Sequence, residues 1–124
     1  MTSTILVNSN PTTLTVQLFT DRVLITITQL PAFGTILTSS ITTSQASSKD
    51  TYNINILLGR RDDDIIPIFV RQIMEKASIF DGGLKEGRNA IFMIGLKEEG
   101  KGREAFVEIS NEVLRVYHEL MLKY

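Results

Sequence analysis

Residues 23–30 read Val-Leu-Ile-Thr-Ile-Thr-Gln-Leu, a sequence that alternates as a β-strand does. Val23, Ile25 and Ile27 recur at every second position, which is the pattern of a β-strand with one face in a protein core. The opposite face holds only leucine and threonine, without a charged side chain: Leu24, Thr26, Thr28 and Leu30. The segment therefore predicts a strand whose second face is only weakly polar.

Further strands are predicted on both sides of this stretch. Upstream, a short apolar run at 5–7 and an alternating segment at 14–18 each precede turn-forming residues. Downstream, residues 35–41 are rich in β-branched side chains, and residues 54–58 alternate up to Gly59. Between these two segments, residues 42–50 are mostly Ser, Thr, Gln and Ala, which predicts a mobile surface loop inserted between two strands.

Beyond Gly59 the apolar residues recur at helical spacing. They predict a helix over about 64–80, with a core-facing stripe of Ile66, Phe69, Ile73, Ala77 and Phe80. The acidic run Asp62–Asp64 suits the start of this helix, and the glycines at 82–83 suit its end. A second apolar stripe, from Arg103 onward, predicts a long amphipathic helix at the end of the sequence.

Residues 90–96 are apolar on both alternating sets, which predicts a central strand that is covered on both faces. The order of segments, with both helices late, indicates an α+β protein: an antiparallel sheet of about six strands with two late helices packed on one face. The 124 residues fit a single domain, 1–124.

Two helices can cover only one face of such a sheet, so the face of Leu24, Thr26 and Thr28 needs another explanation. Threonine in a strand is compatible with solvent, because it has good β-propensity. The doubly apolar segment at 90–96 favours a partner surface instead, since large exposed apolar areas usually mark association. We therefore expect Leu24, Thr26 and Thr28 to form part of a partner interface, and a dimer is the simplest arrangement.

Composition excludes several classes of function. Thirteen basic and fourteen acidic residues give a net charge of −1, which provides no global field for binding nucleic acid or an anionic membrane. The sequence has no cysteine, which excludes disulfides and thiolate chemistry and suits a reducing compartment. No signal peptide or bilayer-spanning stretch is recognised, and we expect a soluble intracellular protein.

No catalytic, cofactor-binding or metal-binding residues are predicted. The only histidine, His118, lies on the last predicted helix without a second histidine or cysteine at ligand spacing, and a catalytic base needs an orienting partner. Asp62–Asp64 lacks the spaced oxygen ligands of a calcium loop, and helix capping explains it. Gly59-Arg60-Arg61 stands where phosphate loops occur, but the three aspartates that follow would repel an anion.

Several motifs, in their order and spacing, resemble the proteasome assembly chaperone 3 family. They are the Thr-Gln-Leu-Pro-Ala-Phe-Gly-Thr of 28–35, the Leu-Leu-Gly of 57–59, the Ile-Phe-Val of 68–70, the Gly-Arg-Asn-Ala of 87–90 and the Glu-Val-Leu-Arg-Val of 112–116. The similarity spans about residues 5–120. No one motif is specific, and their joint order carries the resemblance.

The resemblance implies a small chaperone without enzymatic activity. It implies pairing with a related chaperone of the chaperone 4 type, or with itself when isolated, and assistance in assembling proteasome α subunits into the ring of the 20S core particle. The expected location is the cytoplasm, with the nucleus as an additional compartment.

A rival hypothesis is a small dimeric trafficking adaptor of the longin or roadblock type, which also combines a sheet of five or six strands with helices. Those domains place a helix before or between the early strands, whereas this sequence delays both helices. The position of the helices therefore distinguishes the two hypotheses.

Overall fold

A computed structural model describes residues 1–29, 34–43, 49–59, 65–97 and 102–123. In chain order the elements are β1 (Thr2–Val7), β2 (Asn10–Leu18), β3 (Arg22–Thr28), β4 (Thr35–Thr43), β5 (Asp50–Leu58), α1 (Ile65–Phe80), the short 3₁₀ helix η1 (Gly82–Leu84), β6 (Asn89–Gly95) and α2 (Arg103–Leu122). Both α-helices follow the first five strands, so the predicted α+β class with two late helices is confirmed.

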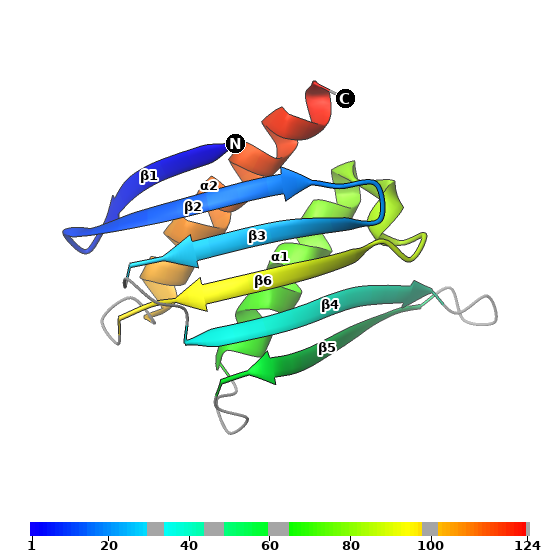
Figure 1. Cartoon of the computed structure of the whole chain (residues 1–124), viewed down its shortest axis with the longest axis horizontal. Helices are drawn as coiled ribbons and strands as arrows, with labels where there is room; N and C mark the ends of the chain where they lie inside the picture. Colours follow the sequence, from blue (N-terminus) through cyan, green and yellow to red (C-terminus); the bar gives the residue numbers. More distant parts are fainter. Residues whose placement is uncertain (30–33, 44–48, 60–64, 98–101, 124) are drawn as a thin grey trace.

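The strands form one six-stranded sheet in the order β1-β2-β3-β6-β4-β5. The expectation of a wholly antiparallel sheet is wrong at one place, because β6 runs parallel to β3 while it pairs antiparallel with β4. This pairing follows from the path of the chain, which leaves the sheet at β5, passes through α1 and returns to the centre (Figure 1). A central position suits β6, which is apolar on both faces.

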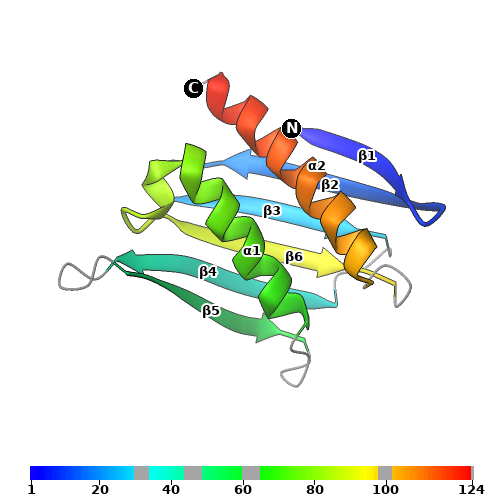
Figure 2. The same ribbon diagram turned by 180° about the vertical axis from the view of Figure 1, so that it is seen from behind.

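Both helices lie on the same side of the sheet (Figure 2). The core between the two layers contains Phe92 and Ile25 from the sheet and Ile73 and Ile109 from the helices, all fully buried. The helices also contact each other directly, with the Phe69 and Phe106 rings stacked at a centroid distance of 4.6 Å.

The predicted loop over 42–50 is too long at both ends. β4 continues to Thr43 and β5 begins at Asp50, and Thr42 and Thr43 pair with Thr51 and Asp50 in the ladder. The Thr43 hydroxyl donates to the Asp50 carboxylate at 2.7 Å. Low hydrophobicity suggested a loop, whereas β-branched threonine is well suited to a solvent-exposed strand end. Residues 44–48 of the predicted loop lie outside the described residues.

The helix predictions are confirmed within the described residues. The described part of α1 spans Ile65–Phe80, with Pro67 in its first turn, where a missing N–H costs little. Glycines follow its end as predicted, and Asp81 accepts a hydrogen bond from the Gly83 N–H at 3.1 Å at the start of η1. The acidic run Asp62–Asp64, predicted to cap α1, lies outside the described residues.

Gly59, directly after β5, is required by both its conformation and its surroundings. Its φ of +122° is one that other residues rarely adopt, and a Cβ there would stand 2.9 Å from the carbonyl oxygen of Gly34. We expect Gly59→Ala to lower the free energy of unfolding by about 1–3 kcal/mol. Chemical denaturation measures this loss. Gly82→Ala is the matched control, because nothing lies within 4 Å of its added Cβ, and equal losses in both variants would contradict the explanation.

Candidate partner-binding face

We call the surface of the sheet that points away from α1 and α2 the open face. Figure 1 views the molecule from this side, and Figure 2 views it from the helix side. Along each strand, successive side chains point alternately to the core and to the open face. The ladder registers therefore define which open-face residues of neighbouring strands lie side by side. Its centre is formed by residues of β3, β6 and β4: Leu24, Thr26, Thr28, Ile91, Met93, Ile36 and Thr38.

Rows of side chains cross the open face from strand to strand. One row runs through Thr15, Thr26, Met93 and Ile36, and the next runs through Gln17, Leu24, Ile91 and Thr38. Neighbouring side chains in such a row are close enough to touch. The middle of the open face is therefore a continuous surface of aliphatic, thioether and threonine side chains.

The three residues predicted from the sequence, Leu24, Thr26 and Thr28, all lie on the open face and are all half-buried by their neighbours. The structure adds Ile91 and Met93, which sequence reasoning did not assign to this site. The sequence did contain a signal for them, because residues 90–96 are apolar at both sets of alternating positions. The parallel pairing of β6 beside β3 that brings them next to Leu24 and Thr26 was not predicted.

Charge is almost absent from the open face. In the six described strands, Arg22 is the only ionisable residue at an open-face position, and it lies at the end of β3. Arg22 forms an exposed ion pair with Asp21 at 3.0 Å. Covering the centre of this face would therefore not require the removal of a charged group from water, which is the costly step in burying polar surfaces.

One corner of the open face is hollowed. A cavity of about 380 Å³ is lined by Phe19, Asp21, Arg22, Leu24 and Ile91. Phe19, in the turn after β2, is about half exposed. This corner has the size and the apolar walls to accept one side chain of a partner, with the Asp21–Arg22 pair at its rim.

A buried polar cluster on the other side of the sheet holds the helix layer in place. The Asp81 carboxylate, only 2% exposed, accepts hydrogen bonds from the Tyr117 hydroxyl and from the Arg88 guanidinium. Burial, together with the hydrogen bond to Asp81, raises the pKa of the Tyr117 phenol, which therefore stays protonated as a donor. The cluster joins α2 to the segment between α1 and β6. The sequence did not predict it, because no local pattern links Asp81 to Tyr117, which lies 36 residues away.

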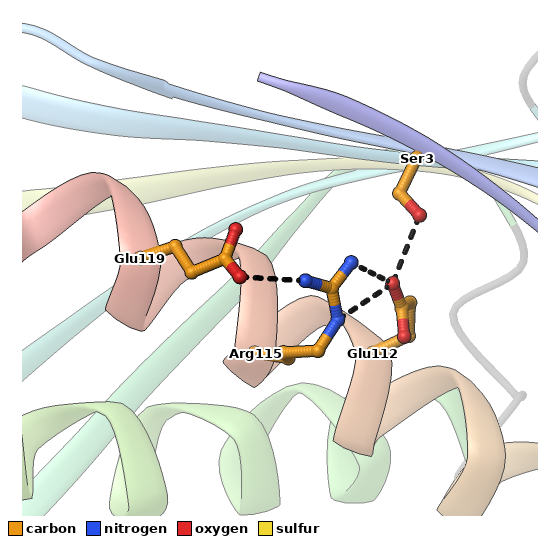
Figure 3. A network of polar contacts seen from close by, with 4 residues as sticks. All are labelled: Ser3, Glu112, Arg115 and Glu119. Carbon is orange, nitrogen blue, oxygen red and sulfur yellow. Dashed lines mark hydrogen bonds and ion pairs between the residues drawn. The ribbon is translucent and has the colours of Figure 1, made fainter.

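A second network joins the first strand to the last helix (Figure 3). The Ser3 hydroxyl of β1 donates to the Glu112 carboxylate at 2.9 Å, and Arg115 donates to Glu112 at 3.0 Å and to Glu119 at 2.9 Å. The hydrogen bond from Arg115 holds the pKa of the Glu112 carboxyl below its usual value. The network fixes β1, an edge strand, against α2.

The remaining candidate residues form no catalytic arrangement within the described residues. His118 is exposed on α2 and its ring lies 4.9 Å from the Phe80 ring. Over residues 1–29, 34–43, 49–59, 65–97 and 102–123, no three His, Asp or Glu residues gather in a group that could hold a metal ion. In the same part of the chain, none of the helices has the length and apolarity needed to cross a bilayer.

The helix layer has an apolar groove of its own, on the side away from the open face. Its volume is about 700 Å³, and its apolar walls come from the N-terminal halves of α1 and α2, including Ile65, Ile68, Phe106 and Val107. Acidic Glu75 and basic Lys76 and Arg103 line the same groove. This mixture of charges favours no particular kind of occupant.

The fold defines a small α+β domain in which helices cover one face of a mixed sheet and the other face is left open. The sequence pattern of the family described as proteasome assembly chaperone 3 matches residues 25–115. The chain belongs to the proteasome assembly chaperone 3 family, as its motifs suggested. It is therefore a proteasome assembly chaperone by family.

A solved structure shares the fold. The chain is similar to one in the crystal structure of a chaperone complex for yeast 20S proteasome assembly, with a TM-score of 0.64, 15% sequence identity, and coverage of 94% of this chain and 96% of that chain. No curated protein sequence matches this one. The rival adaptor hypothesis required a helix before or between the early strands, and both helices here follow β5.

Proposed function

We propose that this protein pairs through its open face with a second small chaperone of related fold, and that the pair promotes assembly of the α-subunit ring of the 20S proteasome. The observation that carries the pairing is the uncharged, half-apolar centre of the open face around Leu24, Thr26 and Met93. Two observations support the α-subunit ring as the assembly on which the pair acts. They are the family membership of the chain and the fold that it shares with a chain of a yeast assembly-chaperone complex.

The size of the open face suits a stable pair. Six strands that each add about 4.8 Å of width, with a mean length of about 26 Å, give a flat area on the order of 750 Å² before side-chain relief is counted. Specific interfaces bury roughly 800 Å² of accessible surface per partner. Face-to-face packing of two sheets would bury the aliphatic rows of both, as in the interior of a β-sandwich.

The threonines of the open face fit such an interface. Thr13 and Thr4 of neighbouring strands contact each other through their hydroxyls at 3.3 Å, and Thr15 and Thr2 do so at 3.2 Å. Hydroxyls that are paired within the sheet can be buried at low cost, while their methyl groups contribute apolar contacts. The partner in cells would be the related chaperone, and the isolated chain would pair with a second copy of itself.

The proposed role needs no catalysis. The protein would act by binding proteasome α subunits while they assemble and then leaving, in the cytoplasm and also in the nucleus. Such a role uses surfaces rather than a reactive site.

Affinity purification from native cells with a site-specific photo-crosslinker tests this function. With the crosslinker at Met93 on the open face, we expect covalent capture of a second small chaperone, and proteasome α subunits should co-purify. The matched control places the same crosslinker at Gln72, which is exposed on α1, and should not capture that chaperone. Vesicle-coat or GTPase partners in place of α subunits would contradict the proposal.

A further inference from the structure

Strand β5 forms one edge of the sheet. It pairs with β4 along its length, from Asp50 opposite Thr43 to Leu58 opposite Ile36. Among the described residues no strand lies on its other side (Figure 1). The N–H and C=O groups of alternate β5 residues therefore point outward in the plane of the sheet without a strand to receive them.

Beyond Asp50, the sequence of β5 itself carries little of the protection that sheet edges usually have, although the Arg71 guanidinium of α1 lies 5.2 Å from the centre of the Tyr52 ring. From Thr51 to Leu58 there is neither a charged side chain nor a proline, the two features that most often block strand addition. β5 is also nine residues long, whereas the opposite edge, β1, has six. β1 is fixed against α2 by the hydrogen bond between Ser3 and Glu112.

The core is incomplete along β5. Tyr52, Ile54 and Ile56 face the helix side but are only partly buried. Their cross-strand neighbours on β4 are closed off from solvent, with Leu37 at 0% and Ile41 at 3% exposure. At Leu37 the difference arises because β4 has β6 on one side and β5 on the other, whereas β5 has only β4 beside it. A strand added beyond β5 would bury this remaining apolar row.

The two ends of β5 differ in polarity, and this difference indicates the occupant. At the start, Asp50 forms an ion pair with Lys85 at 3.3 Å. At the end, Leu57 and Leu58 are 61% and 55% exposed. Two copies paired along the full length of β5 by a two-fold axis would place the charged Asp50 of each against Leu58 of the other, which is a poor match.

We propose that the β5 edge binds an extended segment of a different protein by antiparallel strand addition. The segment would carry apolar side chains at alternate positions, an apolar end beside Leu57 and Leu58, and a polar or basic end beside Asp50. Main-chain hydrogen bonds would provide the affinity and the alternating side chains the selectivity. Pairing through the open face would leave this edge accessible, because the outward main-chain groups lie in the plane of the sheet.

A synthetic peptide tests the edge directly. The probe is a capped nine-residue peptide in which Val alternates with Thr, with Leu at its N-terminus and Lys at its C-terminus. We expect it to slow hydrogen exchange of the outward amides of β5 at least tenfold while β1 amides are unchanged. The same peptide with N-methyl groups on the amides that face β5 should not bind. Equal protection by both peptides, no protection, or protection of the open face would overturn the proposal.

Variants of the protein provide a second test of the proposal. Leu58→Lys introduces a charge at the apolar end of the edge and should weaken peptide binding at least tenfold. Leu6→Lys is the matched control, since Leu6 is 69% exposed on the opposite edge, and it should bind the peptide normally. Equal loss in both variants would overturn the assignment to β5. Protection of β5 amides that rises with protein concentration in the absence of peptide would also overturn it, in favour of a second copy as the occupant.

Discussion

Replacing Thr26 by lysine should abolish pairing of the purified protein while leaving its fold intact. Thr26 lies at the centre of the open face, between Thr15 of β2 and Met93 of β6, and no acidic residue occupies a neighbouring ladder position. An unpaired charge buried there costs several kcal/mol, so the dissociation constant should rise roughly 100-fold or more. In the isolated chain the two copies would bring two such charges together. Analytical ultracentrifugation over a range of concentrations measures the change.

The fold of the Thr26→Lys monomer should survive, because without a partner the lysine can extend its ammonium group into water. Far-UV circular dichroism and the melting temperature of the monomer check this. Gln72→Lys adds the same charge on the exposed surface of α1, away from the open face, and should pair normally. Thr26→Val keeps the shape without the charge and should also pair. If the unmodified protein is a monomer at high concentration, or if Thr26→Lys still pairs, then the interface is misplaced, and the edge strands or α2 become the better candidates.

Removing the Asp81 carboxylate should destabilise the fold strongly. Asp81→Ala leaves the Arg88 guanidinium, whose side chain is 19% exposed, without its carboxylate, and leaves the buried Tyr117 hydroxyl without its acceptor. Removing one partner of a buried ion pair lowers the free energy of unfolding by about 3–5 kcal/mol, because the remaining charge is uncompensated. The melting temperature should therefore fall by about 10 °C or more. Differential scanning calorimetry measures both the loss of free energy of unfolding and the fall in melting temperature.

Further variants separate the lost charge from a general defect in packing. Tyr117→Phe removes only one hydrogen bond and should cost about 1–2 kcal/mol. Asp81→Ala combined with Arg88→Met removes both charges and should recover part of the stability lost in Asp81→Ala. Asp21→Asn alters an exposed ion pair and should leave the melting temperature unchanged. A double variant less stable than Asp81→Ala alone would show that Arg88 contributes through contacts other than this pair.

The sequence predicted the layers of the protein and the character of its two surfaces. Alternation at Val23, Ile25 and Ile27 and helical spacing at Ile66, Phe69 and Ile73 are local patterns, and each can be read within a few residues. These patterns were sufficient to place Leu24, Thr26 and Thr28 on the side away from the helices. The prediction was wrong at Thr42 and Thr43, which were assigned to a loop because of their low hydrophobicity. The ladder that pairs them with Thr51 and Asp50 shows that they are the end of a strand.

The sequence alone was enough to predict about six strands, two late helices, the α+β class and the weakly polar second face. The tertiary structure was needed to see that β6 returns beside β3, which adds Ile91 and Met93 to the open face. It also shows that Asp81 meets Tyr117 across 36 residues, and that β5 is left at an edge. The physical reason is that periodicity reports burial, which is a local property of each segment. Strand order and buried polar contacts depend instead on hydrogen bonds between segments far apart in the chain, and no local pattern encodes which segments will meet.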